Sequence, residues 1–185
     1  MKGVLIGLVV VVVIVVAWGA SARNGLVSER EGINGSFAQV DNVLQRRNDL
    51  IPNLVETVKG FAKQEQNIID SVTNARKAMM GAQSREEKIQ AADALTGALG
   101  RLLVVVENYP QLKSNENFAR LQDELANTEN RIAQERRKYN ETVQKYNTDV
   151  QTFPNNIAAS MFGFQRDDAY FKADAAAKEV PKVKF

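Results

Sequence analysis

Residues 37–61 read FAQVDNVLQRRNDLIPNLVETVKGF, and their apolar side chains recur every three or four positions. This spacing places one apolar stripe along a helix, where it can face other helices. The stripe extends on both sides of the quoted stretch, through Leu26, Ile33, Phe37, Val40, Leu44, Ile51, Leu54, Val58, Phe61, Glu65, Ile68, Val72, Ala75 and Met79. The pattern therefore predicts long helices that pack on one another.

Pro52 is expected to interrupt this stripe, because a proline inside a helix removes one hydrogen bond and clashes with the preceding turn. Asn48 or Asp49 is suited to cap a new helix that has Pro52 in its first turn. We therefore expect two helices here. One long helix kinked at Pro52 is the alternative, because the apolar register continues across the proline.

Two later helices carry their own boundary signals. The stretch 81–84 predicts a stop, after which Ser84 and Glu87 form a capping-box pattern that opens a new helix. Pro110 ends that helix, since the residue before a proline is pushed out of helical angles. Ser114 or Asn115 then begins the last helix. Its apolar stripe comprises Phe118, Leu121, Leu125, Thr128, Ile132, Glu135, Tyr139, Val143, Tyr146, Val150 and Phe153.

The fold class follows from these elements, because no clear alternation of apolar and polar residues predicts a strand. We expect an all-α protein, with an N-terminal transmembrane helix followed by an up-and-down four-helix bundle of long helices. A three-helix coiled coil with a long first helix kinked at Pro52 is the alternative. The expected domains are a transmembrane signal anchor at 1–22, the helical bundle at 23–164 and a C-terminal tail at 165–185. The tail is interpreted as either a docking arm or a disordered segment.

The first twenty or so residues form an apolar leader. No charge occurs from Gly3 to Ala22, and about twenty apolar residues match the roughly 30 Å hydrocarbon core of a bilayer. A cleaved signal peptide ending at Ala22 is the alternative to an uncleaved anchor. The Gly3-x-x-x-Gly7 spacing predicts a close contact between two such helices in the membrane.

The flanking charges predict the orientation of the leader. Lys2 stands before it, whereas Arg23 and Arg30 beyond it are interleaved with acidic residues. Because basic residues favour the cytoplasmic side, we expect the N-terminus in the cytoplasm. The bundle is then expected on the extracytoplasmic side of the membrane, which the chain crosses once.

The composition excludes several classes of function. The chain has 24 Lys and Arg against 22 Asp and Glu, a net charge of +2, so it lacks the clustered basic face of a nucleic-acid-binding protein. Cysteine and histidine are both absent. Their absence removes thiolate nucleophiles, cysteine-ligated metals and the usual general base near neutral pH. We expect no catalytic residue, no cofactor and no metal.

Two carboxylates on the apolar stripes are the only candidates for catalytic residues in this sequence. Glu65 and Glu135 could share a proton or hold a metal if they were buried together. The interpretation that we favour is structural, with each glutamate bound by a tyrosine hydroxyl or by an arginine. The candidate arginines are Arg46, Arg47, Arg136 and Arg137.

Two tyrosine–asparagine pairs recur one heptad apart, at Tyr139-Asn140 and Tyr146-Asn147. The spacing puts both rings on one stripe of a helix. Core packing with a polar handle explains this pattern. An aromatic cage for a ligand is the alternative.

The string from Gln45 to Ala62, QRRNDLIPNLVETVKGFA, resembles the signature of the LemA family. Further stretches agree, among them 104–110, 121–133, 139–147, 153–154 and 162–164. The signature residues, which we interpret as structural, are Arg46, Arg47, Asp49, Pro52, Asn53, Glu56, Lys59, Gly60, Glu65, Tyr109, Pro110, Glu129, Asn130, Tyr139, Asn140, Tyr146, Asn147, Phe153 and Pro154. Gly32 and Gly35 depart from the family pattern, and they weaken the expectation that the membrane helix runs straight into the bundle.

The resemblance implies a single-pass bacterial membrane protein that carries a four-helix bundle and has no established enzymatic activity. The leading hypothesis is a membrane-anchored scaffold that forms homo-oligomers through its helical bundle. The alternative is a monomeric adaptor that binds an envelope protease or hydrolase, with Tyr170, Phe171, Val183 and Phe185 as exposed anchors of its tail. A cofactor-free enzyme that uses Glu65 and Glu135 is the remote third hypothesis.

Overall fold

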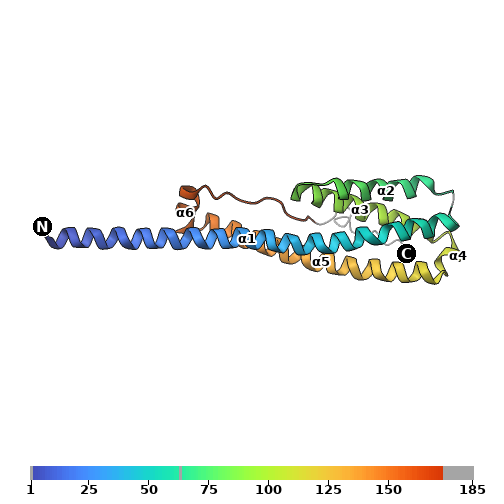
Figure 1. The fold of residues 1–185 in the computed structure, drawn as a ribbon, viewed down its shortest axis with the longest axis horizontal. Helices are drawn as coiled ribbons and strands as arrows, with labels where there is room; N and C mark the ends of the chain where they lie inside the picture. Colours follow the sequence, from blue (N-terminus) through green and yellow to red (C-terminus); the bar gives the residue numbers. More distant parts are fainter. Residues whose placement is uncertain (1, 63, 173–185) are drawn as a thin grey trace, which may run out of the picture. The chain divides into compact units, whose positions relative to one another are not determined.

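A computed structural model describes residues 2–62 and 64–172, and all regular structure in these residues is helical (Figure 1). The helices are α1 (Lys2–Phe61), α2 (Gln66–Gly81), α3 (Arg85–Val106), α4 (Pro110–Lys113), α5 (Glu116–Gln151) and α6 (Asn155–Phe162). The all-α prediction is confirmed. The described residues fall into two compact units: unit 1 contains residues 2–38 and 137–170, and unit 2 contains residues 39–62, 64–136 and 171–172. The predicted domain boundaries at 22 and 164 stay a prediction.

The predicted break at Pro52 was wrong, because the 60 residues of α1 form one helix that continues through the proline. Buried side chains lie on both sides of the proline, including Ile51 and Leu54, while Pro52 itself is exposed. Burying several such side chains stabilises a helix by roughly 1.5–3 kcal/mol each, which outweighs the cost of about 3 kcal/mol for an interior proline. Gly32 and Gly35 likewise lie inside α1, so the leader does continue into the bundle as one helix.

Unit 2 is an up-and-down arrangement of four long helical segments, namely the second part of α1, α2, α3 and the first part of α5, with the short α4 between α3 and α5. Helices α2 and α3 pack against one another along their length (Figure 1). The shared core comprises Ile51, Leu54, Val55, Val58, Ala62, Ile69, Val72, Leu95, Ala98, Leu99, Leu102, Val106, Leu112, Phe118 and Leu125. Phe61 departs from the predicted stripe and is 41% exposed.

The starts of α3 and α5 follow local capping chemistry, as predicted, whereas the predicted cap at Asn48 or Asp49 is absent because both residues lie inside α1. The Ser84 hydroxyl accepts the Glu87 amide at 3.1 Å, and the Glu87 carboxylate accepts the Ser84 amide at 3.2 Å. At the start of α5 the Asn115 side chain accepts the amides of Asn117 and Phe118. These bonds satisfy amides that the first helical turn leaves without partners.

Unit 1 pairs the first part of α1 with the end of α5 in antiparallel directions. The rings of Phe37 and Tyr139 meet edge to face, with their centroids 5.4 Å apart. Toward the N-terminal end of α1, Lys145 forms an ion pair with Glu29. The predicted stripe of α5 is buried through Val150 except at Leu121 and Glu135, which are half-buried, but Phe153 is 75% exposed. That part of the prediction was wrong because α5 ends at Gln151, before Phe153.

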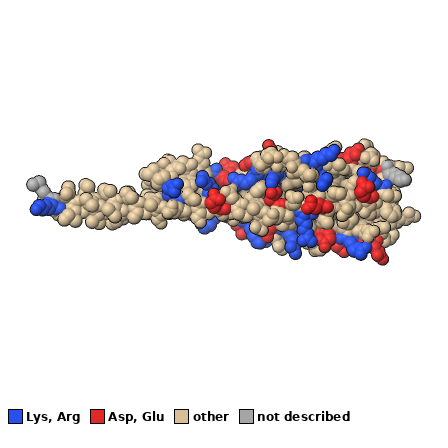
Figure 2. Space-filling view, in the orientation of Figure 1, with Lys and Arg blue, Asp and Glu red and all other residues tan. Residues whose placement is uncertain are grey.

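The apolar leader forms the first turns of α1, and its side chains from Val4 to Val16 are exposed. An 18-residue window of α1 has a mean hydropathy of 2.9 and no buried residue. Figure 2 shows no charged side chain along this part of the helix. Helix α3 is also long and apolar enough to cross a membrane, with a mean hydropathy of 1.5. Its residues Leu95 and Leu102 lie in the core of unit 2, so we interpret α3 as a core helix.

Candidate functional site

The most deeply buried charged side chain that the structure describes belongs to Arg47, which is 1% exposed. Its Nη1 donates to Glu129 Oε2 and to Thr96 Oγ1, both at 2.8 Å, and its Nη2 donates to the Ala92 carbonyl at 3.2 Å. One guanidinium thereby joins α1, α3 and α5. Burial lowers the pKa of Arg47 from its ordinary value, and the nearby Glu129 carboxylate opposes that shift. The guanidinium remains charged, because arginine is not deprotonated in proteins.

Arg47 is a predicted structural residue and a candidate partner of Glu65 or Glu135. Its position and partner differ from the expectation. Arg47 lies in the interior of α1 rather than at a helix junction, and its partner is Glu129. No local pattern in the sequence indicates Glu129 as the partner, since a charge at an outer helix position carries no sign of a distant residue.

Other ion pairs connect the same helices. Arg46 pairs with Glu124 at 3.0 Å on the exposed face of α1 and α5. Arg136 pairs with Asp93 at 3.0 Å, from α5 to α3. Because each pair joins helices that are distant in the sequence, the set fixes how the helices are aligned along one another.

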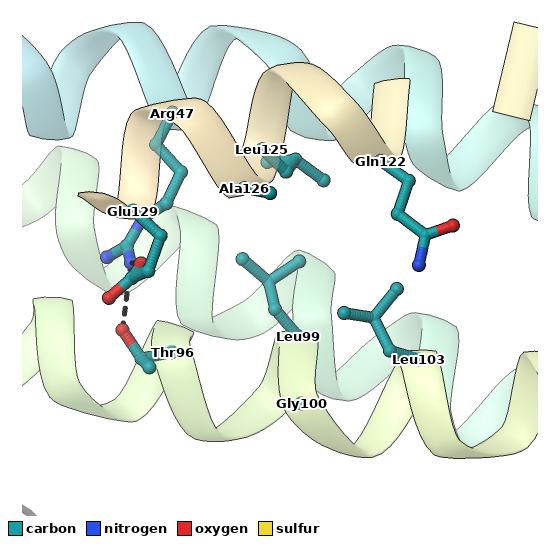
Figure 3. A pocket seen from close by; sticks show the side chains of 9 residues that line it. All are labelled: Arg47, Thr96, Leu99, Gly100, Leu103, Gln122, Leu125, Ala126 and Glu129. Atoms are coloured by element: carbon teal, nitrogen blue, oxygen red, sulfur yellow. Dashed lines mark hydrogen bonds and ion pairs between the residues drawn. The ribbon is translucent and has the colours of Figure 1, made fainter. Parts of the chain in front are cut away.

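A cavity of about 300 Å³ lies beside the Arg47 tie, within unit 2. Its lining consists of Arg47, Thr96, Leu99, Gly100, Leu103, Gln122, Leu125, Ala126 and Glu129. Figure 3 shows the guanidinium and Glu129 at one end, and Leu103 and Gln122 at the other. Only Arg47 and Glu129 carry a charge among these nine residues, and they pair with each other. The lining therefore suits an apolar group better than a reaction that needs a free acid or base.

The two candidate catalytic carboxylates, Glu65 and Glu135, do not lie together. Glu65 lies in the connection from α1 to α2, where its Oε1 accepts the Tyr109 hydroxyl at 2.9 Å. The pKa of Tyr109 is raised, first because the phenol donates to this carboxylate. Glu135 lies 19 residues beyond Glu116, the first residue of α5, which is about 28 Å along that helix.

This geometry confirms the predicted tyrosine partner for Glu65. It also corrects the idea that Glu65 and Glu135 might share a proton, because Tyr109 ties Glu65 to the end of α3 whereas Glu135 lies far along α5. Within residues 2–62 and 64–172 no three acidic side chains gather as a metal site.

The tyrosine–asparagine pairs of α5 bind an extended segment, residues 164–170, that we call the strap. The Tyr139 hydroxyl donates to the Ala169 carbonyl at 2.7 Å, and the Tyr146 hydroxyl donates to the Gln165 carbonyl at 2.9 Å. Both rings are buried, so core packing with a polar handle is confirmed. Burial is also the first cause that raises the pKa of Tyr146.

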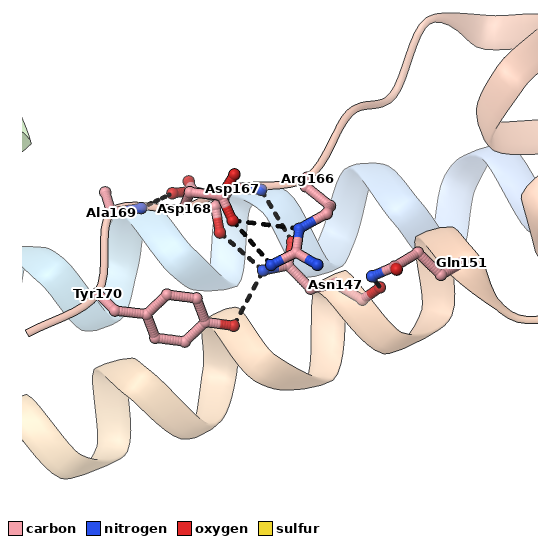
Figure 4. A network of polar contacts seen from close by, with 7 residues as sticks. All are labelled: Asn147, Gln151, Arg166, Asp167, Asp168, Ala169 and Tyr170. Carbon is pink, nitrogen blue, oxygen red and sulfur yellow. Dashed lines mark hydrogen bonds and ion pairs between the residues drawn. The ribbon is translucent and has the colours of Figure 1, made fainter.

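Asn147 makes the largest number of bonds to the strap (Figure 4). Its amide nitrogen donates to the Asp167 carbonyl at 2.7 Å and to the Tyr170 hydroxyl at 2.9 Å. Its side-chain oxygen accepts the Asp167 amide at 2.8 Å. The polar atoms of α5 thus bind alternate residues of an extended backbone.

The strap corrects the expectation for the tail. Tyr170 is half-buried and Phe171 is buried, so neither is the exposed anchor that the adaptor hypothesis requires. In unit 2 the Phe171 ring lies under the guanidinium of Arg136, 4.6 Å from its centroid. Val183 and Phe185 fall outside the described residues.

The remaining signature residues do not converge on one site. Asp49, Asn53, Glu56, Lys59, Gly60, Asn130 and Pro154 are exposed. Pro110 is the first residue of α4 and Asn140 is half-buried. Two of the exposed residues, Asn53 and Glu56, line a surface groove of about 490 Å³ together with Thr57, Asn117, Arg120, Leu121 and Glu124. Gly3 and Gly7 have open space around them, and their predicted helix contact stays a prediction.

Comparison with known proteins agrees with the signature. The model of the LemA family matches residues 36–185 of the chain. A search of curated proteins gives no match.

Proposed function

The chain belongs to the LemA family, and from this premise we propose that it is a membrane-anchored, non-enzymatic scaffold that forms homo-oligomers. Its leader crosses the bacterial inner membrane once, and its bundle stands on the extracytoplasmic side. The observation that carries the proposal is the continuity of α1. The same helix supplies an uncharged, exposed leader and buried side chains of the unit 2 core.

A structural role accounts for the polar residues of the signature better than catalysis does. Arg47 binds Glu129 from α1 to α5, and Tyr109 binds Glu65 between two helix connections. Tyr139, Tyr146 and Asn147 bind the strap. Such buried networks fix the alignment of helices. Groups that are already bonded in this way are poor acids, bases or nucleophiles.

Self-association through the bundle seams is disfavoured, because the stripe residues of α1 and α5 are already buried inside the chain. The leader carries the longest run of exposed apolar side chains among the residues that the structure describes. A Gly3-x-x-x-Gly7 spacing lets two such helices approach closely in lipid. Confinement to a membrane raises the effective concentration of the chains, so that weak contacts suffice for assembly.

The mass of the full-length protein in mild detergent and in nanodiscs tests this proposal. We expect a discrete oligomer for the natural chain, a smaller mass for the double variant Gly3→Leu and Gly7→Leu, and a monomer for a chain that starts at Arg23. The matched control is Val4→Leu with Leu8→Val, which preserves both glycines. A monomeric natural chain contradicts the scaffold.

The side of the membrane is tested by labelling, since the chain has no natural cysteine. The variant Ser114→Cys carries an exposed thiol between α4 and α5. An impermeant maleimide should label it in cells whose inner membrane is intact. Labelling only after lysis places the bundle in the cytoplasm.

A monomeric adaptor is the second candidate function, and the groove beside Asn53 and Glu56 is the observation that favours it. A partner such as an envelope protease or hydrolase would bind there rather than at the strap. Crosslinking in native membranes should then capture a partner with the natural chain and with the control Glu141→Ala, but not with Glu56→Ala. Equal capture by all three excludes the groove.

A further inference from the structure

Residues 150–165 of unit 1, which include α6, form the second long uncharged segment of the chain, after the leader. No Asp, Glu, Lys or Arg occurs between Asp149 and Arg166. Within this segment four large apolar side chains are exposed: Phe153, Ile157, Met161 and Phe162. Phe153 and Met161 are the most exposed of these, at 75% and 71%. We call these four residues the α6 patch.

Helix α6 is inverted relative to an ordinary surface helix, which turns its large apolar residues inward. Its two buried residues are the small Ala158 and Ala159. Ile157 and Met161 are four positions apart, so they share one face of the helix, and both are exposed. Helix α6 thus packs against the rest of the chain through its small alanines, and its large apolar side chains face outward.

A contact with α1 positions helix α6 within unit 1. The guanidinium of Arg23 lies over the Phe162 ring, 5.9 Å from its centroid. Arg23 is the first charged residue after the leader. Along the axis of α1, the α6 patch therefore lies at the position where the leader ends.

The pairing of α1 with α5 gives the same level independently. Lys145 pairs with Glu29, and three residues earlier on α5 Thr142 lies opposite Gly32. The two helices advance in opposite directions at the same rise, so the end of α5 at Gln151 lies level with Arg23. Phe153 follows directly beyond that point.

The leader itself shows where the rest of unit 1 begins to cover it. The residues from Val4 to Val16 are exposed, whereas Trp18, Gly19 and Ala22 are half-buried. Packing against the chain therefore starts inside the uncharged leader, before its last turn.

We propose that the α6 patch is a second membrane contact, which lies in the interfacial layer of the same bilayer that the leader crosses. This inference rests on the proposed membrane anchoring. A bilayer is the occupant that fits because the patch is uncharged, adjoins the leader and is bordered by Arg23 and Arg166, whose side chains can reach lipid phosphates. Patches of apolar side chains beside a membrane span are otherwise exposed to water at a cost in free energy.

Nitroxide accessibility in full-length protein tests the proposal. Single cysteines replace Val12 in the leader, Met161 in the α6 patch and Glu141 on the exposed face of α5, and the protein is reconstituted in phosphatidylcholine–phosphatidylglycerol vesicles. All three positions are exposed, so none of the substitutions removes a buried side chain. Collision rates with oxygen and with a water-soluble nickel chelate report whether each label lies in lipid.

We expect the label at position 161 to collide with nickel at least about threefold less often than the label at 141, because the hydrocarbon boundary excludes the chelate. Its collision rate with oxygen should be higher. Adding Ile157→Asp should return the label at 161 toward the values at 141, whereas the matched change Asn156→Asp should not.

The label at position 12 separates the two proposals. If it lies in lipid while the label at 161 behaves like the one at 141, the membrane contact of α6 is excluded and the anchor stands. If the label at 12 is exposed to nickel, the anchor itself fails. A label at 161 that is shielded from both reagents and broadened by a second spin indicates a contact between two copies of the chain, and it overturns the lipid contact.

Discussion

Arg76 Nε donates a hydrogen bond of 3.2 Å to the main-chain carbonyl of Asn48, from α2 to α1. Asn48 lies four residues before Pro52, so its carbonyl is the one that the missing amide of the proline leaves without a helical donor. Asn48 is buried, and an unpaired carbonyl there would lower the stability of the fold. Helix α2 therefore supplies the bond that the proline removes, and α1 continues.

The Arg76 bond should matter only while Pro52 is present. We expect Arg76→Ala to lower the free energy of unfolding by about 1.5 kcal/mol in the natural chain, as for a hydrogen bond to a charged group. In a Pro52→Ala background the restored amide satisfies Asn48, and the cost of Arg76→Ala should fall below about 0.5 kcal/mol. Denaturant unfolding followed by circular dichroism in detergent measures both differences.

Arg101→Ala is the matched control for that cycle. Arg101 belongs to the same unit and binds the Ser71 hydroxyl on the protein surface. Its removal should have the same small effect with proline or alanine at position 52. Equal costs of Arg76→Ala in the two backgrounds contradict the proposed role of this bond.

The Arg47–Glu129 pair should respond unequally to the loss of its two members. Glu129→Ala leaves a buried guanidinium without its counter-charge, and we expect a loss of about 3 kcal/mol. Arg47→Met leaves Glu129, which is 46% exposed, to be hydrated, so the expected loss is within about 1 kcal/mol. Arg46→Met, at the adjacent exposed pair, should change stability by less than about 1 kcal/mol. A larger loss for Arg47→Met than for Glu129→Ala contradicts this account.

Asn147 should hold the strap in place. Asn147→Ala removes three hydrogen bonds to the strap, each worth about 1 kcal/mol. Amide hydrogen exchange of the strap should then accelerate by roughly 100-fold, since 1.4 kcal/mol corresponds to tenfold in an equilibrium. Exchange in α2 and α3 should not change. Asn156→Ala, on the exposed side of α6, is the control, and equal strap exchange in both variants counts against the interpretation.

The Tyr109–Glu65 bond should be visible in alkaline titration. The fold raises the pKa of Tyr109 above its ordinary value of 10.0 because the phenol donates to Glu65. A raised pKa means that this bond stabilises the fold below pH 10 and that its contribution disappears as the pH rises through the folded-state value. Glu65→Gln should lower the pKa of Tyr109, as measured by the absorbance of phenolate at 295 nm.

Two controls make this titration specific. Tyr109→Phe identifies which of the four tyrosines gives the shifted signal. Glu141→Gln removes one exposed carboxylate elsewhere and should leave the titration as it is. An unchanged Tyr109 titration in Glu65→Gln means that the bond does not set this pKa.

Local signals predicted the parts of the fold that depend on neighbours within four residues. The capping box of Ser84 and Glu87 and the cap at Asn115 were predicted because the interacting groups are two to three residues apart. The apolar stripes predicted most of the buried side chains of α1 and α5 for the same reason. The predicted burial of Phe153 was wrong because helix periodicity carries no information about the residue at which the helix ends.

The candidate site was predicted only in part. The polar function of Tyr139 and Tyr146 could be inferred from amphipathic rings on a core stripe, but their acceptors could not. Those acceptors are main-chain carbonyls of the strap, up to 30 residues away, and any residue type presents the same carbonyl. A backbone acceptor therefore leaves no trace in the sequence.

By itself, the sequence determined that this chain is helical, where α3 and α5 begin, and that it carries an uncharged leader, because each of these depends on side-chain spacing and on contacts within one or two turns. Only the tertiary structure decided whether α1 would pass through Pro52, which residue would neutralise Arg47 and where the tail would lie. Each of these depends on a partner at least 20 residues away along the chain, such as Arg76 for Asn48 or Glu129 for Arg47. The physical reason is that a helix-breaking residue costs free energy locally, while burial and a distant hydrogen-bond donor can repay it only after the helices have packed.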